Sequence, residues 1–169
     1  GAIIHGGGHE KGLRSGTLNV PGIVGLGKAL EIAKNEMVTD SERICGLRNY
    51  LEEQLLKIEN SSVNGSTNQR LYNVSNICFK GADADAIIID LKGIALSNGS
   101  ACTSASIEPS HVLKAIGLSD EDAFSSLRLS LGRFTIKEDI DYAIKAIKET
   151  VTNLRLMTNG QHNGKEKMA

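Results

Sequence analysis

Aromatic residues are scarce in this sequence, which has no tryptophan, three tyrosines and three phenylalanines. Lysine and arginine together number 19 against 20 aspartates and glutamates, and the positive charges form no block. Nucleic-acid binding usually needs a concentrated basic face and aromatic side chains on which bases stack. We therefore expect no nucleic-acid partner for this chain.

Long apolar runs and paired cysteines are missing as well. No apolar stretch approaches the roughly 20 residues needed to span a bilayer, and residues 1–4 do not resemble a secretory signal. Cys45, Cys78 and Cys102 are widely spaced, which fits neither a disulfide framework nor a zinc site. We expect a protein of a reducing compartment, the cytoplasm, without membrane association. The lack of an initial methionine indicates further residues upstream.

The pattern of apolar residues predicts a mixture of helices and a few strands. We expect a glycine-rich loop over 1–19, helices over 21–37, 40–58, 84–91, 109–116 and 136–157, and strands over 74–79, 94–96 and 126–131. Ser119 is expected to cap a short turn, and Thr135 with Glu138 to form a capping box before the last helix. Residues 158–169 have no apolar pattern and are expected to be disordered. The predicted fold class is α+β, with helices packed on a small sheet.

Cys102 is the first candidate for chemistry. It lies in a segment of small and polar residues, 97–108, with no large apolar neighbour to bury it. An exposed thiol can react, although a chance surface cysteine is the alternative, because no activating base is adjacent. Cys45, beside the apolar stripe of a helix, and Cys78, in a strand, are expected to be packing residues.

Arg128 is the second candidate. Strand alternation places it on the face opposite Leu127 and Leu129. The fork of donors on a guanidinium matches the two oxygens of a carboxylate. Composition alone favours a solvated surface arginine at this position.

The glycine-rich loop is the third candidate. Residues 12–17 offer backbone N–H groups, a hydroxyl and a guanidinium, all suited to phosphate. The loop lacks the Gly-Lys-Ser/Thr ending of a Walker loop. His5, His9 and Glu10 do not have the HExxH spacing, so we expect no metal.

Three segments, taken in order, resemble the cysteine desulfurase family. Residues 6–17, GGGHEKGLRSGT, are similar to its GGGHExGxRSGT segment, and residues 99–105, GSACTSA, followed by EPS at 108–110, are similar to its catalytic loop. Residues 125–133, SSLRLSLGR, are similar to its SSxRxSLGR strand. The resemblance is to the branch with a long catalytic loop, which serves iron–sulfur cluster assembly or nitrogenase maturation.

This resemblance implies a mechanism. Pyridoxal phosphate acts as an electron sink for substrate L-cysteine, and the Cys102 thiolate takes the sulfur, leaving L-alanine and a Cys102 persulfide. Arg128 matches the arginine that holds the substrate carboxylate, and Thr17 matches a residue that touches the cofactor phosphate across a homodimer interface. The persulfide would pass to an iron–sulfur scaffold or another sulfur acceptor protein.

One departure from the family concerns the cofactor. The family's cofactor lysine follows a histidine, and none of the four histidines here precedes a lysine. The resemblance thus implies the small C-terminal domain of a fold-type I enzyme over 21–157, with residues 1–20 from the large domain or dimer interface. The chain alone would be inactive. A non-catalytic truncated paralogue acting as an interaction module, or a generic α+β domain that binds a small molecule, are the alternatives. Asn98 stands where the family often has serine.

Overall fold

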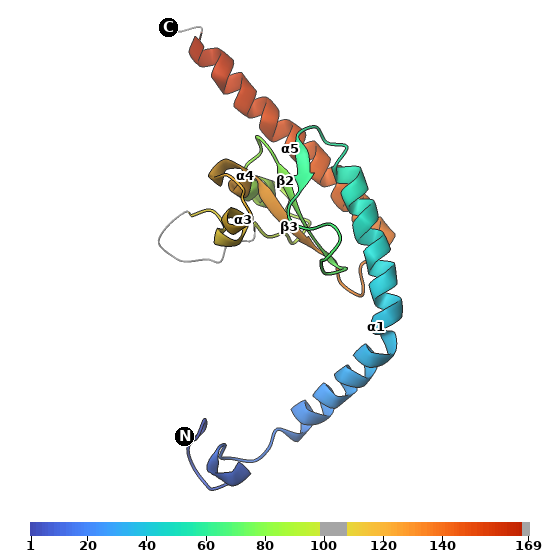
Figure 1. Cartoon of the computed structure of the whole chain (residues 1–169), viewed down its shortest axis with the longest axis vertical. Coiled ribbons are helices and arrows are strands. Elements are labelled where there is room, and N and C mark those ends of the chain that lie inside the picture. Colours follow the sequence, from blue (N-terminus) through green and yellow to red (C-terminus); the bar gives the residue numbers. More distant parts are fainter. Residues whose placement is uncertain (99–107, 167–169) are drawn as a thin grey trace. The chain divides into compact units, whose positions relative to one another are not determined.

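The computed structural model describes residues 1–98 and 108–166, with side chains up to residue 158 (Figure 1). The chain divides into two units, Gly1–Thr39 and Asp40–Ala169, each of which is described by itself. The boundary between these units lies inside helix α1 (Val20–Leu55). No helix among the described residues is both long and apolar enough to cross a membrane.

Helix α1 replaces the two separate helices expected over 21–37 and 40–58. It begins after Asn19, whose side-chain oxygen accepts the Gly22 N–H at 3.1 Å, as an N-cap residue does. The expected break is wrong because residues 38–40 include neither glycine nor proline, so the backbone hydrogen bonds continue through them.

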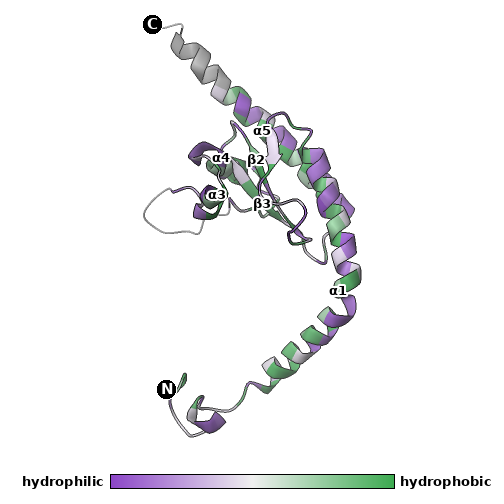
Figure 2. Cartoon of the chain, in the orientation of Figure 1, coloured by the Kyte–Doolittle hydropathy of each residue, from purple (hydrophilic) through white to green (hydrophobic). Residues whose placement is uncertain are grey.

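The two halves of α1 differ in how their apolar residues are covered. In the first unit the helix carries many apolar residues, which Figure 2 shows in green, and the large ones are exposed. Its large apolar side chains are between 55% and 66% exposed: Ile23, Val24, Leu26, Leu30 and Met37. In the second unit, the same helix buries Ile44, Leu51 and Leu55 to 2% exposure or less.

A three-stranded antiparallel sheet lies at the centre of the second unit, in the order β1 (Ser61–Val63), β2 (Val74–Phe79) and β3 (Ser126–Ser130). Both longer strands were expected from the sequence and are confirmed. The strand expected over 94–96 is absent from the described residues, and pairing begins one residue later with a single bridge between Ser97 and Arg128. Ile94 and Leu96 pack against the core instead.

Four further helices complete the second unit: α2 (Ala84–Asp90), α3 (His111–Ala115), α4 (Asp120–Phe124) and α5 (Lys137–Glu166). The expected cap at Ser119 is confirmed, because its side chain accepts the Asp122 N–H at 3.1 Å. A short 3-10 turn, η1 (Glu10–Gly12), interrupts the loop of the first unit.

Helix α5 departs from the sequence expectation at both ends. It begins one residue later than a Thr135 cap would place it, and the Asp139 carboxylate accepts the Ile136 N–H at 3.1 Å. Asp139 therefore takes the part expected of Glu138, while the Thr135 hydroxyl accepts the Gly132 N–H. At the other end the backbone stays helical through residues 158–166, because each added residue completes a further hydrogen bond.

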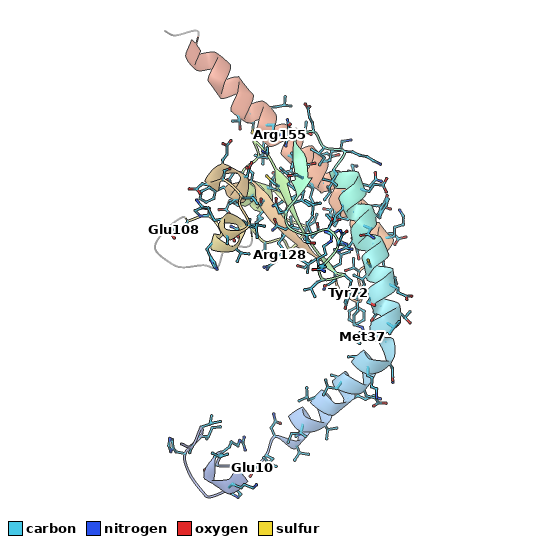
Figure 3. The ribbon with its side chains drawn as sticks, in the orientation of Figure 1. Glu10, Met37, Tyr72, Glu108, Arg128 and Arg155 are labelled. Atoms are coloured by element: carbon cyan, nitrogen blue, oxygen red, sulfur yellow. The ribbon has the colours of Figure 1, made fainter. Side chains whose placement is uncertain are left out.

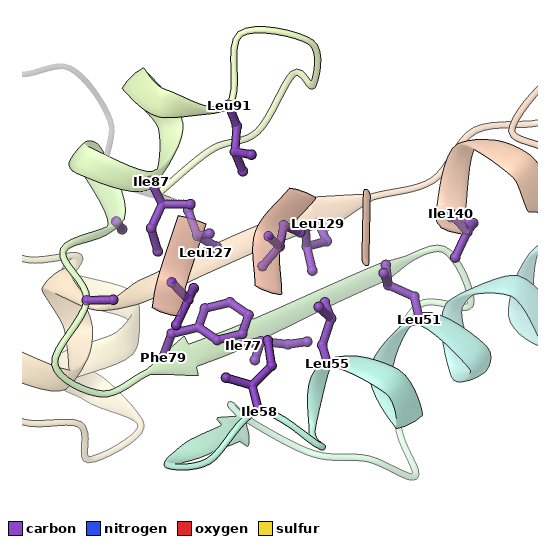
Figure 4. Close-up of a cluster of buried hydrophobic side chains, with 14 of the residues drawn as sticks. Leu51, Leu55, Ile58, Ile77, Phe79, Ile87, Leu91, Leu127, Leu129 and Ile140 are labelled. Atoms are coloured by element: carbon purple, nitrogen blue, oxygen red, sulfur yellow. The ribbon is translucent and has the colours of Figure 1, made fainter. Parts of the chain in front are cut away.

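The core lies between one face of the sheet and the helices α1, α2 and α5 (Figure 4). Its centre consists of fully buried residues from both strands and three helices: Phe79, Ile77, Leu127, Leu55, Ile87, Ile147 and Val151. The strands contribute alternate residues and α5 contributes the predicted apolar stripe. The α+β arrangement is therefore confirmed.

A buried ion pair joins α1 to the segment before β2. The Arg70 guanidinium donates to both carboxylate oxygens of Glu52, at 2.5 and 2.7 Å, and the Glu52 side chain is 9% exposed. Burial by itself would raise the pKa of Glu52, but the Arg70 hydrogen bonds and the charges of Arg70 and Arg48 outweigh it. The pKa of this carboxyl therefore lies below its ordinary value.

Glu52→Gln should lower the free energy of unfolding by about 3 kcal/mol at pH 7, because it leaves the Arg70 charge buried without its partner. The lowered pKa of Glu52 means that its contribution is present above the unfolded pKa and is lost as pH falls through the folded one. Urea unfolding of the chain between about pH 7 and 3 should show a smaller pH dependence in this variant. Glu53→Gln, which changes an exposed neighbour paired with Lys57, is the control and should behave like the wild type. Equal stabilities of the two variants would contradict the assignment.

Candidate active site

Strand β3 determines where Arg128 lies. Leu127 and Leu129 are 0% and 3% exposed on the core side, so the pleat turns the Arg128 side chain to the opposite face, where it is exposed (Figure 3). The backbone of Arg128 is held on both sides, by its partner Asn76 on β2 and by Ser97, whose carbonyl accepts the Arg128 N–H at 2.7 Å. The predicted direction of this side chain is confirmed.

The face that carries Arg128 is polar and already hydrogen-bonded. The Asn64 side-chain amide donates to the Asn76 oxygen at 2.6 Å and to the Ser126 hydroxyl at 2.9 Å. Ser126 in turn donates to the Asp122 carbonyl at 2.6 Å. Within the described part of the chain the Arg128 guanidinium forms no hydrogen bond or ion pair of its own. An anion arriving at this face would therefore meet an uncommitted cation.

The segment that contains Cys102 has its two ends fixed in the second unit. On the N-terminal side, Ser97 is bridged to β3 and the Asn98 amide donates to the Asp85 carboxylate at 2.7 Å. On the C-terminal side, buried Ser110 is the N-cap residue that precedes α3. Cys102 itself lies outside the described residues, so its chemistry is argued from the sequence.

The glycine-rich loop of the first unit contains Thr17. The Arg14 guanidinium donates from Nη1 to the carbonyls of Gly16 and Thr17, at 2.8 and 2.9 Å, and buried Ser15 donates to the Gly7 carbonyl. Arg14, expected to offer its guanidinium to phosphate, is used here to shape the turn. The turn needs glycine at residue 16, where φ is +89°.

Thr17 lies at the exposed end of this turn. Its hydroxyl and the backbone around it are therefore accessible to a phosphate group, but Thr17 belongs to the first unit and Arg128 to the second. His5, His9 and Glu10 lie on the same loop, and the described residues contain no group of three or more His, Cys, Asp and Glu side chains that would hold a metal.

Cys78 and Cys45 have different surroundings. Cys78 is 1% exposed, and burial raises the pKa of its thiol, with the nearby Asp122 charge acting in the same direction. Cys45 is half-buried, and its sulfur accepts from the Arg48 guanidinium at 3.2 Å. The packing role expected for Cys78 is confirmed, whereas the arginine contact of Cys45 was missed, although its signal is the three-residue spacing on a helix.

Two contributions to the site were not found from the sequence. Asn76 could have been found, because the register of β2 against β3 places it opposite Arg128. Asp85 had no such signal, since it lies on α2 and reaches Asn98 only through the fold.

Comparison with known proteins shows to which family this chain belongs. The profile of the family described as aminotransferase class-V matches residues 6–143, which include the glycine-rich loop, Cys102 and Arg128. The chain belongs to the class-V aminotransferase family.

Several relatives within this family are known by name. The chain is 54% identical over 154 residues to cysteine desulfurase IscS of Histophilus somni, covering 91% of this chain and 38% of that protein. It is 51% identical over 157 residues to cysteine desulfurase IscS of Shewanella halifaxensis, covering 93% of this chain and 39% of that protein. The chain thus spans less than two fifths of the length of these relatives.

Solved structures of the same kind have the same fold. A NifS-like protein is similar with a TM-score of 0.76 at 33% identity, over 89% of this chain and 39% of that one. A NifS-like protein from Rickettsia africae is similar with a TM-score of 0.74 at 34% identity, with the same coverage. Both include the mixture of helices and a small antiparallel sheet seen in this class-V chain.

Proposed function

We propose that this chain supplies the sulfur-accepting cysteine and the carboxylate-binding arginine of a pyridoxal-phosphate-dependent cysteine desulfurase. One observation carries the proposal: the Ser97–Arg128 bridge joins the start of the Cys102 segment to the strand that presents a guanidinium with no bonding partner among the described residues. The names of the relatives at 51–54% identity support the same assignment. The reaction converts L-cysteine to L-alanine and leaves a persulfide on Cys102.

Arg128 binds the substrate. Its guanidinium extends from a strand whose backbone is paired on both sides, and it forms no hydrogen bond or ion pair with the other described residues, so two parallel N–H···O bonds can hold the substrate carboxylate. Fixing the carboxylate at a rigid strand also fixes the direction in which the substrate thiol extends. Orientation of this kind lowers the barrier of the chemical step as well as improving binding.

Cys102 accepts the sulfur. Its thiolate attacks the sulfur of the bound L-cysteine, the new S–S bond forms as the carbon–sulfur bond breaks, and the carbon takes a proton to become L-alanine. The sum is L-cysteine plus a thiol giving L-alanine plus a persulfide, with no external oxidant. The small residues on either side of Cys102 leave its sulfur open to a second thiol, that of an acceptor protein.

Pyridoxal phosphate, when bound, supplies the electron sink that weakens the carbon–sulfur bond. Thr17 fits a contact to its phosphate, because its side chain is exposed at the end of a glycine turn. The carbonyl contacts of Arg14 hold that turn in place. The lysine that anchors the cofactor is assigned to another part of the protein, since no histidine here precedes a lysine.

The partners follow from this chemistry. We assign the persulfide to an iron–sulfur scaffold or another acceptor protein in the cytoplasm. The phosphate contact from Thr17 is assigned to the partner subunit's cofactor in a homodimer. In this assignment residues 1–20 serve the large domain or dimer interface, and residues 21–157 form the small C-terminal domain.

The chain alone should not attach pyridoxal phosphate covalently, and it should release no sulfide from cysteine. The reason is the missing His-Lys pair. The measurement is mass spectrometry after mixing with pyridoxal phosphate and reducing with borohydride. A stoichiometric adduct on one lysine would contradict the prediction. If sulfide release stays absent after the cofactor-bearing part is supplied, the interaction module becomes the better assignment.

Cys102→Ser should abolish sulfide release by the holoenzyme reconstituted with the cofactor-bearing part, because a hydroxyl cannot hold sulfane sulfur. Cys78→Ala and Cys45→Ser are the matched controls and should keep most of the activity, since Cys78 is buried with a raised pKa. Mass spectrometry should locate the persulfide on residue 102. A persulfide on either other cysteine would overturn the assignment of the nucleophile.

Arg128→Ala should raise the KM for L-cysteine, because the loss of a bidentate carboxylate contact costs about 2–3 kcal/mol, or about 30-fold and more in affinity. Arg128→Lys keeps the positive charge but loses the forked pair of donors. Its KM for L-cysteine should lie between those of the wild type and Arg128→Ala. Steady-state kinetics of alanine formation by the holoenzyme give KM and kcat for each variant. An unchanged KM in Arg128→Ala would exclude this residue from the carboxylate site.

A further inference from the structure

We propose that Asp85 is a positioning residue for sulfur transfer, acting through Asn98 on the chain segment that leads to Cys102. The inference rests on the proposed function and deepens it. It comes from one juxtaposition: the side chain of Asn98 is bonded to helix α2, while the backbone of the residue before it is bonded to the strand that carries Arg128.

Among the bonds that reach Ser97 and Asn98 from the described residues, two come from different elements. The Ser97 carbonyl accepts the Arg128 N–H at 2.7 Å, and the Asn98 amide donates to Asp85 Oδ1 at 2.7 Å. A single backbone bond fixes the place of a peptide but leaves rotation about it. The second bond, to a charged acceptor and therefore stronger than a neutral one, removes that rotation.

Asp85 is free for this role because a neighbour already caps the helix. Asp83 is the N-cap of α2, and its side chain accepts the Ala86 N–H at 2.9 Å. Asp85 lies in the first turn, where a carboxylate is favoured by the helix dipole. Its carboxylate is therefore available to accept the Asn98 amide.

Loss of the Asp85–Asn98 bond should affect the chemical step without affecting substrate binding. Arg128 remains held by the β2–β3 ladder whether or not Asn98 is anchored, so the affinity for the carboxylate should not depend on Asp85. The approach of the Cys102 sulfur to a substrate fixed at Arg128 should depend on it. Small misplacements of a reacting group reduce the rate of the chemical step.

The test uses the reconstituted holoenzyme with Asp85→Ala, Asn98→Ala and the double variant. Each single variant should lower kcat for alanine formation about fivefold, the effect of one net hydrogen bond, with the KM for L-cysteine unchanged. The double variant should lose no more than either single one. Asp85→Asn keeps the acceptor oxygen and should restore most of kcat.

Asp83→Ala is the matched control, because it removes a carboxylate and a cap bond from the same helix end without touching Asn98. It should lower thermal stability and leave kcat near the wild-type value. An equal loss of kcat in Asp83→Ala, losses that multiply in the double variant, or a wild-type kcat in Asp85→Ala would each overturn the proposal.

A second readout does not depend on activity. Hydrogen exchange at the Arg128 amide, which donates to Ser97, should become about fivefold faster in Asp85→Ala and stay unchanged in Asp83→Ala. If the wild-type holoenzyme releases no sulfide from cysteine, the proposed function fails. The exchange rates then decide the anchoring role by themselves, and equal protection in Asp85→Ala and wild type overturns it.

Discussion

The pairing of β2 with β3 is the constraint on which the rest of the second unit depends. Ile77 lies opposite Leu127 with both side chains fully buried, and this contact sets the register of the two strands. A slip of one residue would turn the leucines of β3 outward and bury Arg128. The hydrophobic core and the candidate substrate site are therefore consequences of one register, and a change in the core would also move the guanidinium.

Elements that follow from local patterns could be predicted from the sequence. The alternation of leucine with serine and arginine predicted β3 and the outward direction of Arg128, because successive residues of a strand face opposite sides. The apolar stripe of α5 and the cap at Ser119 were predicted in the same way, from spacings within one element. These features depend on neighbours a few residues apart, and such neighbours are visible in the chain.

Features that depend on distant residues could not be predicted. The pairs Glu52–Arg70 and Asp85–Asn98 join segments that only the fold brings together, and charge patterns in the sequence do not single them out. The continuity of α1 was missed for a different reason. Asp40 is a common first residue of a helix, but it accepts from the Arg43 side chain instead of starting a new one. The preference of aspartate for the start of a helix was outweighed by the continuous hydrogen bonding of the α1 backbone, which no glycine or proline interrupts at this point.

The arginines of this chain fall into those that stabilise the fold and one that is a candidate for substrate binding. Several of them are committed to carbonyl or carboxylate oxygens within the chain: Arg14, Arg43, Arg48, Arg70 and Arg155. Arg155, for example, donates to the carbonyls of Lys80 and Glu59 and so ties α5 to the loops around the sheet.

Arg128 differs from these residues in a way that folding does not explain. It stands on a strand whose backbone is paired with β2 on one side and bridged to Ser97 on the other, yet within the described residues its guanidinium is left without an oxygen partner. A surface cation on a flexible side chain loses little by remaining solvated, so exposure alone would indicate nothing. A rigid strand, a polar face with its own hydrogen bonds satisfied, and a bridge to the Cys102 segment together give the guanidinium a fixed place at which a carboxylate can be recognised.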